Sequence, residues 1–259
     1  AIIIEHNIKQ EFDEAAVNQA RSVAPRLSKK DFEGRCDFTG KTIFTIDGDD
    51  ARDFDDAVSL EMLENGSYEL GVHIADVANY VTHASPLDAE AFERGTSVYL
   101  ADRVIPMLPV ELSNGICSLN PNVDRLTLSV IMEIDSSGNI TGHKLVKSVI
   151  HSCERMTYNN VAKILDGDTE LREKSAHIVP TLEKMHELAA ILNARREKRG
   201  SINFDFPESR IIAGEDGRPK EIVKVVRNDA HKLIEEFMLA ANETIAEFAF
   251  WADIPFVYR

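Results

Sequence analysis

The sequence predicts an α+β fold, with a mixed or antiparallel sheet and helices packed on it. Residues 57–63 and 68–77 are rich in strand-forming residues and flank the turn signal Asn65-Gly66, while residues 126–135 and 140–150 flank the turn-like residues 136–139. Short turns of this kind join antiparallel strands. Both strand pairs precede the longest helical segments instead of alternating with them, which argues against a doubly wound parallel sheet.

The other elements follow from hydrophobic spacing along the chain. Residues 12–24 repeat apolar side chains at helical spacing, and Pro25 ends that helix. Residues 41–47 form a β-rich run that delivers Asp47 at its end. Pro86 begins a helix over residues 86–95, because the first turn does not need its missing N–H. Further along, the pattern predicts helices at 158–166, 179–199 and 229–252 and strands near 202–206 and 221–226.

Length and charge limit the possible classes of protein. The chain has 259 residues, enough for a sizeable core, and a formal net charge of −15. That charge argues against a protein that grips nucleic acid through a uniformly basic surface, but not against an enzyme whose acidic centre binds metal. The three cysteines form no CxxC pair, which argues against zinc knuckles and disulfides and favours the cytoplasm. No apolar run approaches the ~20 residues of a membrane span.

The most informative stretch is TIDGDDARDFDDAVSLE, residues 45–61. It carries six aspartates: Asp47, Asp49, Asp50, Asp53, Asp55 and Asp56. Carboxylates this close repel one another, so some must be protonated, well solvated or bound to a cation. A solvated loop does not need a strand to deliver its first aspartate, and Phe54 and Ala57-Val58 interrupt the acidic run. A bound cation is therefore the favoured interpretation.

Two familiar loops fail to fit this stretch. An EF-hand needs Gly at position 6 and Glu at position 12, and a frame that begins at Asp47 places Arg52 and Val58 there. Gly40-Lys41-Thr42 resembles the end of a P-loop, but the pattern needs Gly where Arg35 stands. Zinc is poorly supported because the histidines form no HxxxH pair, and His73, inside an apolar strand, is interpreted as a hydrogen-bonded core residue.

Magnesium fits the acidic stretch better. It prefers hard oxygen ligands and retains several waters, so a few carboxylates suffice for one or two ions. Paired ions can activate water and stabilise the leaving oxygen in phosphodiester cleavage. In an extended segment Asp53 and Asp55 point the same way and Asp56 the other, and Asp47 joins them only if the loop folds back at Gly48. The spacing does not identify the reaction.

The same stretch resembles the signature of the ribonuclease II/ribonuclease R (RNB) superfamily catalytic domain. Within that superfamily it most resembles the bacterial ribonuclease R group. The resemblance continues in GVHIADVANYV, GTSVYLADRVIPMLPVELSNGICSLNPNVDRLTLSV, ERMTYNNV and NDAHKLIEEFMLAANE. It implies a magnesium-dependent 3′-to-5′ exoribonuclease that degrades single-stranded RNA processively to nucleoside 5′-monophosphates. It also implies that residues 1–40 are a helical lead-in and that residues 41–259 are the N-terminal portion of an RNB-type catalytic domain, incomplete at its C-terminus.

The resemblance assigns roles to eight residues. Asp47 and Asp56 match the leading metal ligands, with Asp53 assisting, and Asp55 matches the aspartate most critical for chemistry. Tyr99 matches an aromatic that stacks on a base near the 3′ end, and Phe204 matches its clamp partner, although Phe206 lies on the same strand face. Tyr158 and Glu235 match positions that distinguish RNA from DNA, which lacks the ribose 2′-OH, and the neighbouring Glu236 stays open as an alternative.

The resemblance further implies a monomer with flanking RNA-binding domains of the OB-fold type and a later arginine-rich motif. No such motif occurs here, and Arg195-Arg196 is interpreted as part of a solvated helical charge run. The alternative function is therefore a catalytically inactive RNA-binding or regulatory fragment of the same fold. The presence of all four matching aspartates favours the enzyme.

Overall fold

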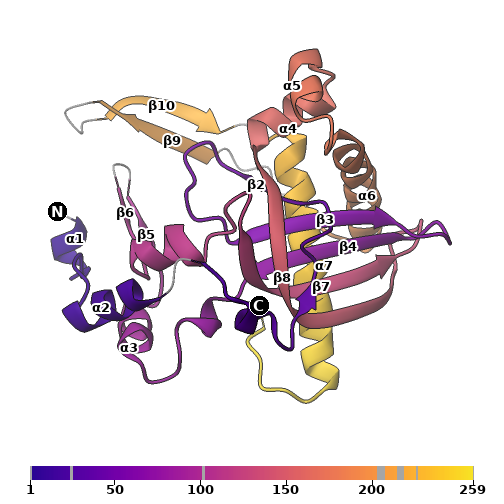
Figure 1. The fold of residues 1–259 in the computed structure, drawn as a ribbon. Coiled ribbons are helices and arrows are strands. Elements are labelled where there is room, and N and C mark those ends of the chain that lie inside the picture. Colours follow the sequence, from indigo (N-terminus) through magenta and orange to yellow (C-terminus); the bar gives the residue numbers. More distant parts are fainter. Residues whose placement is uncertain are drawn as a thin grey trace.

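A computed structural model describes residues 2–23, 26–100, 103–202, 208–214, 219–225 and 227–258. A curved sheet lies beside α6 and α7, the helices α1, α2 and α3 lie on the other side, and the β9–β10 hairpin projects at the upper left (Figure 1). The helices are α1 (Ile2–Glu5), α2 (Glu14–Ser22), α3 (Pro86–Arg94), α4 (Tyr158–Leu165), α5 (Thr169–Lys174), α6 (Val179–Lys198) and α7 (Asp229–Trp251). The strands are β1 (Cys36–Asp37), β2 (Ile43–Asp47), β3 (Asp56–Met62), β4 (Tyr68–Ala75), β5 (Val98–Tyr99), β6 (Val104–Ile105), β7 (Asp124–Ile134), β8 (Ile140–Thr157), β9 (Glu208–Ala213) and β10 (Pro219–Val225).

The long strand β8 organises the main sheet. The strand order is β1-β8-β2-β3-β4-β7, and β7 also pairs with β8. The first part of β8 pairs antiparallel with β7, and its last part, from Ser152 to Thr157, pairs parallel with β2. Because both sides of the sheet meet on this strand, the sheet curls. The mixed α+β architecture that the sequence predicts is confirmed.

One face of the sheet forms the main core with α6 and α7. Alternate residues such as Val58 and Leu60 of β3 and Leu70 and Val72 of β4 are buried on that face, as the period of two in a strand requires. Both helices bring apolar faces to it: Leu182, Met185 and Leu188 from α6, and Ala230, Leu233 and Phe237 from α7. This packing places the N-terminus of α7 and the start of α4 at one end of the sheet.

The other face carries a chain of buried polar side chains. His73 is fully buried, its Nε2 lies 3.0 Å from Ser59 Oγ, and its Nδ1 lies 2.7 Å from Ser129 Oγ. Ser129 Oγ lies 2.5 Å from Ser148 Oγ on β8. Gly71 leaves the space for this chain, because a Cβ there would lie 2.3 Å from Ser59 Oγ. His73 is thus a hydrogen-bonded core histidine, as the sequence predicts.

Several elements differ from the sequence prediction. The strand expected over 140–150 continues to Thr157, because its last residues pair with β2, a contact that no local pattern reveals. The short α5, β1, β5 and β6 were not predicted. Most of the strand expected at 202–206 lies outside the described residues, as does Phe204. No described helix is long and apolar enough to cross a membrane. The division at residue 40 stays a prediction.

Candidate active site

The acidic stretch lies at one end of the main sheet. β2 leaves the sheet at Asp47 and β3 enters it at Asp56, and the two strands pair antiparallel, with Phe44 opposite Val58. The two aspartates therefore lie at the same sheet end. The parallel pairing of β2 with β8 places Thr157 opposite Asp47, so that α4 begins there with Tyr158. The curled sheet thus brings β2, β3 and β8 together around these carboxylates.

The loop between β2 and β3 is anchored through Phe54. The Phe54 side chain is buried, its N–H donates to Ser118 Oγ at 3.0 Å, and its carbonyl accepts from the Leu119 N–H at 2.8 Å. Because successive side chains of an extended segment point in opposite directions, the burial of Phe54 turns the flanking Asp53 and Asp55 outward. Asp55 is exposed and Asp53 half-buried.

Burial and mutual repulsion disfavour the charged form of three of these carboxyl groups. Burial, with repulsion from Asp56 and Asp53, raises the pKa of Asp47 to about 6. Asp55 is exposed by surface area, yet partial desolvation of its carboxyl group raises its pKa, with a contribution from Asp53. Burial raises the pKa of Asp56, with a contribution from Asp55. Each carboxylate would therefore gain from a nearby cation, which opposes both causes.

The donor set fits a hard divalent cation. Asp47 Oδ2 is buried and has no hydrogen-bond partner among the described residues, and such an orphaned oxygen is a candidate ligand. Among those same residues, no three His, Cys, Asp or Glu side chains converge closely enough to enclose a metal ion. An ion held by few carboxylates and several waters, as is usual for Mg²⁺, is compatible with this arrangement. The metal-ligand assignment of Asp47, Asp53 and Asp56 stays a prediction.

Tyr99 lies beside the acidic group although it is remote in sequence. It stands on β5 with 67% of its surface exposed, and its hydroxyl lies 3.4 Å from Asp53 Oδ2. This distance is long for a hydrogen bond between oxygens, so the contact is a weak one. Burial of the hydroxyl and the charge of Asp53 raise the pKa of Tyr99. Its exposed ring is available to a planar ligand.

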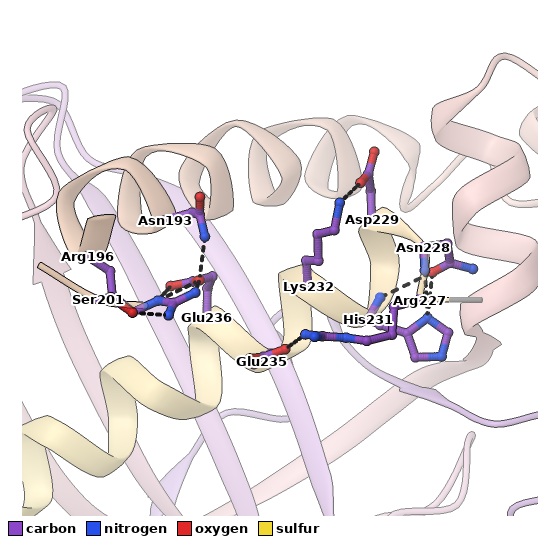
Figure 2. A network of polar contacts seen from close by, with 10 residues as sticks. All are labelled: Asn193, Arg196, Ser201, Arg227, Asn228, Asp229, His231, Lys232, Glu235 and Glu236. Atoms are coloured by element: carbon purple, nitrogen blue, oxygen red, sulfur yellow. Dashed lines mark hydrogen bonds and ion pairs between the residues drawn. The ribbon is translucent and has the colours of Figure 1, made fainter. Parts of the chain in front are cut away.

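Tyr158 lies on another side of the same group. Burial, with the charges of Asp56 and Asp47, raises the pKa of Tyr158 to about 12. Its ring stacks on His231 in the first turn of α7, and its carbonyl accepts a hydrogen bond from Asn228 Nδ2 at 3.2 Å. Figure 2 shows His231 and Asn228 at the start of α7. Sequence reasoning asked only whether the histidines could bind zinc, and it therefore missed the contact of His231 with Tyr158.

The two adjacent glutamates of α7 have different surroundings (Figure 2). Glu236 is 5% exposed and forms an ion pair with Arg196 Nη2 at 2.6 Å across the α6–α7 contact. Glu235 points outward and pairs with Arg227 at the surface. Glu236 is therefore engaged in the α6–α7 contact, whereas Glu235 lies at the surface. The interpretation of Arg196 as a solvated charge is wrong, because this side chain faces α7.

Arg155 and Asn159 also hold the acidic loop, and the sequence did not reveal them. Arg155 Nη2 donates to the carbonyls of Gly48 and Asp49, and Asn159 Nδ2 donates to Asp49 Oδ2 at 2.6 Å. Both residues lie in the stretch ERMTYNNV, which drew attention only to Tyr158. No signal in the sequence marks them, because the strand predicted there ends at residue 150 and Arg155 lies on a strand only through its pairing with Thr45.

Comparison with known proteins decides the family of this fold and site. A model of the RNB domain matches residues 35–259. The chain belongs to the RNB domain family. Ribonuclease R 1 of Lactococcus lactis subsp. lactis (strain IL1403) is 49% identical to this RNB chain over 258 residues, which cover 100% of the chain and 32% of that protein. Ribonuclease R of Escherichia coli (strain K12) is 45% identical over 254 residues, which cover 98% of the chain and 31% of that protein.

A solved structure agrees with the fold of this RNB chain. Mycoplasma genitalium RNase R in complex with ribose-methylated single-stranded RNA superposes with a TM-score of 0.91 at 31% identity, over 98% of this chain and 39% of that one. The chain spans about a third of the length of the curated relatives named here.

Proposed function

We propose that this chain is part of a 3′-to-5′ exoribonuclease that hydrolyses single-stranded RNA processively to nucleoside 5′-monophosphates with magnesium. One observation carries the proposal. Asp47, Asp53, Asp55 and Asp56 lie at one sheet end between two tyrosines, of which Tyr99 is exposed and Tyr158 is within electrostatic reach of Asp47 and Asp56. Membership of the RNB domain family and the RNA bound to the Mycoplasma genitalium relative support the same conclusion.

The carboxylates would have different roles, in metal binding or in orienting water, according to their positions. Asp47 and Asp56, both partly buried, would hold the cation, with Asp53 beside them. When bound, Mg²⁺ supplies the positive charge that activates water and stabilises the leaving oxygen. Asp55, which is exposed, would orient the attacking water against the scissile phosphate. Because both the N–H and the carbonyl of Phe54 are hydrogen-bonded, the flanking Asp53 and Asp55 are already oriented before RNA binds.

The tyrosines and Glu235 would bind the end of the RNA. Every nucleobase offers a π-face, so stacking on exposed Tyr99 would hold the 3′ end without sequence preference, at about 1–3 kcal/mol per base. A tyrosine hydroxyl is protonated at neutral pH with or without the raised pKa of Tyr158, so it can donate a hydrogen bond to a ribose 2′-OH. Glu235 would accept a hydrogen bond from the same kind of hydroxyl. The role of Phe204 as a second stacking residue stays a prediction.

The test uses the full-length parent protein and a 5′-labelled single-stranded RNA. We expect the RNA to shorten from its 3′ end with Mg²⁺ and to stay intact in excess chelator. Asp55→Asn should lower turnover by at least ~10³-fold, because it removes a group that acts on the reacting atoms, while RNA affinity stays within about threefold. Asp50→Asn, in the same loop but outside the proposed site, is the matched control and should keep wild-type turnover.

Two results would overturn the proposal. Wild-type turnover by Asp55→Asn would remove the catalytic assignment. Tight RNA binding without cleavage, in the full-length protein with Mg²⁺, would favour an RNA-binding or regulatory module of the same fold. The implied monomeric state and the flanking OB-fold-type domains are predictions that sedimentation and the sequence of the parent protein would check.

A further inference from the structure

Arg155 makes the contacts that hold the beginning of the acidic loop. It lies near the end of β8, where it is paired with Thr45 of β2. Its Nη2 donates to the carbonyls of Gly48 and Asp49, at 2.5 Å and 3.0 Å, which are the first two carbonyls after Asp47. A guanidinium can bridge two acceptors because its donors are fixed in one plane. The chain direction at the exit from β2 is therefore set by β8.

The same side chain also reaches the far part of the loop. The Arg155 guanidinium carbon lies 5.4 Å from the centre of the Phe54 ring, within the range of a cation–π contact. Asn159, in the first turn of α4, donates to Asp49 Oδ2 at 2.6 Å. The junction between β8 and α4 thus contacts the loop at its beginning and again at Phe54, the residue that turns Asp53 and Asp55 outward.

The loop needs such a contact because its own charges oppose its shape. Six aspartates between residues 47 and 56 repel one another, and repulsion favours a spread conformation. The positive charge of Arg155 acts on Asp47 and opposes the rise in its pKa. Its Nη2 contacts two carbonyls while its charge acts on a carboxylate, so the same group can fix the backbone and reduce the repulsion.

We propose that Arg155 is a positioning residue, which orders residues 48–54 so that Asp47, Asp53 and Asp55 are placed for cation and phosphate. Its effect on turnover depends on the proposed function, whereas its effect on the loop does not. The two loop carbonyls engage its Nη2, so the proposal gives this nitrogen a contact with the loop and none with the RNA.

The experiment compares Arg155→Met and Arg155→Lys with Arg172→Met in the full-length protein. Arg172 is the matched control because it also bridges a backbone carbonyl, that of Ile164, and a carboxylate, that of Glu183, away from the acidic loop. Four quantities are measured: amide hydrogen exchange at Ala51 and Phe54, Mn²⁺ affinity by titration, kcat, and Kd for RNA. The Ala51 and Phe54 amides are chosen because they donate to Gly48 O and Ser118 Oγ, within the loop and across it.

For Arg155→Met we expect at least ~10-fold faster exchange at both amides, and Mn²⁺ affinity lower by about 10–100-fold, as for other residues that orient metal ligands. The value of kcat should fall together with the Mn²⁺ affinity, while Kd for RNA stays within about threefold of the wild-type value. Arg155→Lys keeps the charge but cannot bridge both carbonyls in one plane, so it should be intermediate. Asn159→Ala should cause a smaller increase in exchange at Ala51, and Arg172→Met should change none of the four quantities.

The outcomes distinguish the positioning role of Arg155 from a direct contact with RNA and from a failure of the chemical step. Unchanged exchange at Ala51 and Phe54 in Arg155→Met would overturn it, whatever the turnover. Unchanged exchange combined with weaker RNA binding would assign Arg155 to the RNA phosphates instead. If the wild-type protein cleaves no RNA, the exchange and Mn²⁺ measurements still decide the positioning role. Asp55→Asn, which should stop turnover without changing loop exchange, distinguishes failure of the chemistry from failure of the loop.

Discussion

The ring of Tyr158 stacks on the imidazole of His231, with ring centres 3.9 Å apart and planes inclined by 17°. The first residue of α4 is thereby held against the first turn of α7. Asn228 caps α7 by accepting from the His231 N–H, and its side chain donates to the Tyr158 carbonyl. The phenol is thus fixed from two directions beside Asp47 and Asp56, whose charges raise its pKa together with burial.

Replacement of Tyr158 by phenylalanine should change the choice of sugar rather than the fold. The variant keeps the ring that stacks on His231 and loses only the hydroxyl. One neutral hydrogen bond is worth about 1 kcal/mol, so we expect the preference for RNA over a strand with 2′-deoxy sugars at its 3′ end to fall about fivefold. Competition between the two labelled strands measures it. His231→Phe is the control, because it keeps an aromatic partner for the Tyr158 ring and leaves the Tyr158 hydroxyl in place. An unchanged preference in Tyr158→Phe would show that the Tyr158 hydroxyl does not recognise the ribose.

The adjacent glutamates of α7 should respond differently to alanine. Glu236→Ala leaves Arg196 partly buried without its partner, which should lower the free energy of unfolding by about 3 kcal/mol. Glu235→Ala breaks a surface pair with Arg227 and should lower it by less than about 1 kcal/mol. Urea unfolding measures both values. The preference for RNA over DNA should change in Glu235→Ala, and a change confined to Glu236→Ala would reverse the assignment.

Two glycines in the main sheet allow a controlled test of the packing around the buried polar side chains near His73. A Cβ on Gly71 would lie 2.3 Å from Ser59 Oγ and 2.7 Å from His73 Nε2, whereas a Cβ on Gly142 meets no atom within 4 Å. Gly71→Ala should therefore lower the free energy of unfolding by about 1–3 kcal/mol, as overpacking does, and Gly142→Ala by less than about 0.5 kcal/mol. Equal effects of the two substitutions, measured by thermal or urea unfolding, would contradict the close contact at Gly71.

His73 should make stability depend on pH. Burial, with a small contribution from Lys41, lowers the pKa of His73 from 6.5 to about 3. The unfolded chain therefore binds the proton first, so this contribution is complete above about pH 6.5 and is lost progressively as pH falls toward 3. The slope is about 1.4 kcal/mol per pH unit within that window.

The measurement for His73 is the free energy of unfolding at pH 7 and pH 5. His73→Gln should be less stable at pH 7 but should have a flatter pH dependence than the wild type. His83→Gln changes a fully exposed histidine and should keep the wild-type dependence. A His73→Gln variant as steep as the wild type would show that this histidine takes up its proton without unfolding.

Local pattern was sufficient for most of the fold. α6 and α7 begin where apolar spacing at helical period begins, and β3–β4 and β7–β8 turn at the predicted signals, because these features depend on residues close in sequence. The pattern failed for the end of β8. Residues 152–157 become a strand only because they pair with β2, and that pairing depends on the curl of the whole sheet.

The sequence by itself determined the chemistry available to this protein. Asp53, Asp55 and Asp56 are within four residues of one another, so they must lie close together in any fold, and their hard oxygens favour a divalent cation. Only the tertiary structure decided which distant side chains join them. Tyr99 reaches Asp53 because β5 lies against the loop, and Arg155 crosses from β8 to Gly48. The physical reason is that these contacts follow from helix packing and sheet curl, which sum many weak interactions over the whole chain.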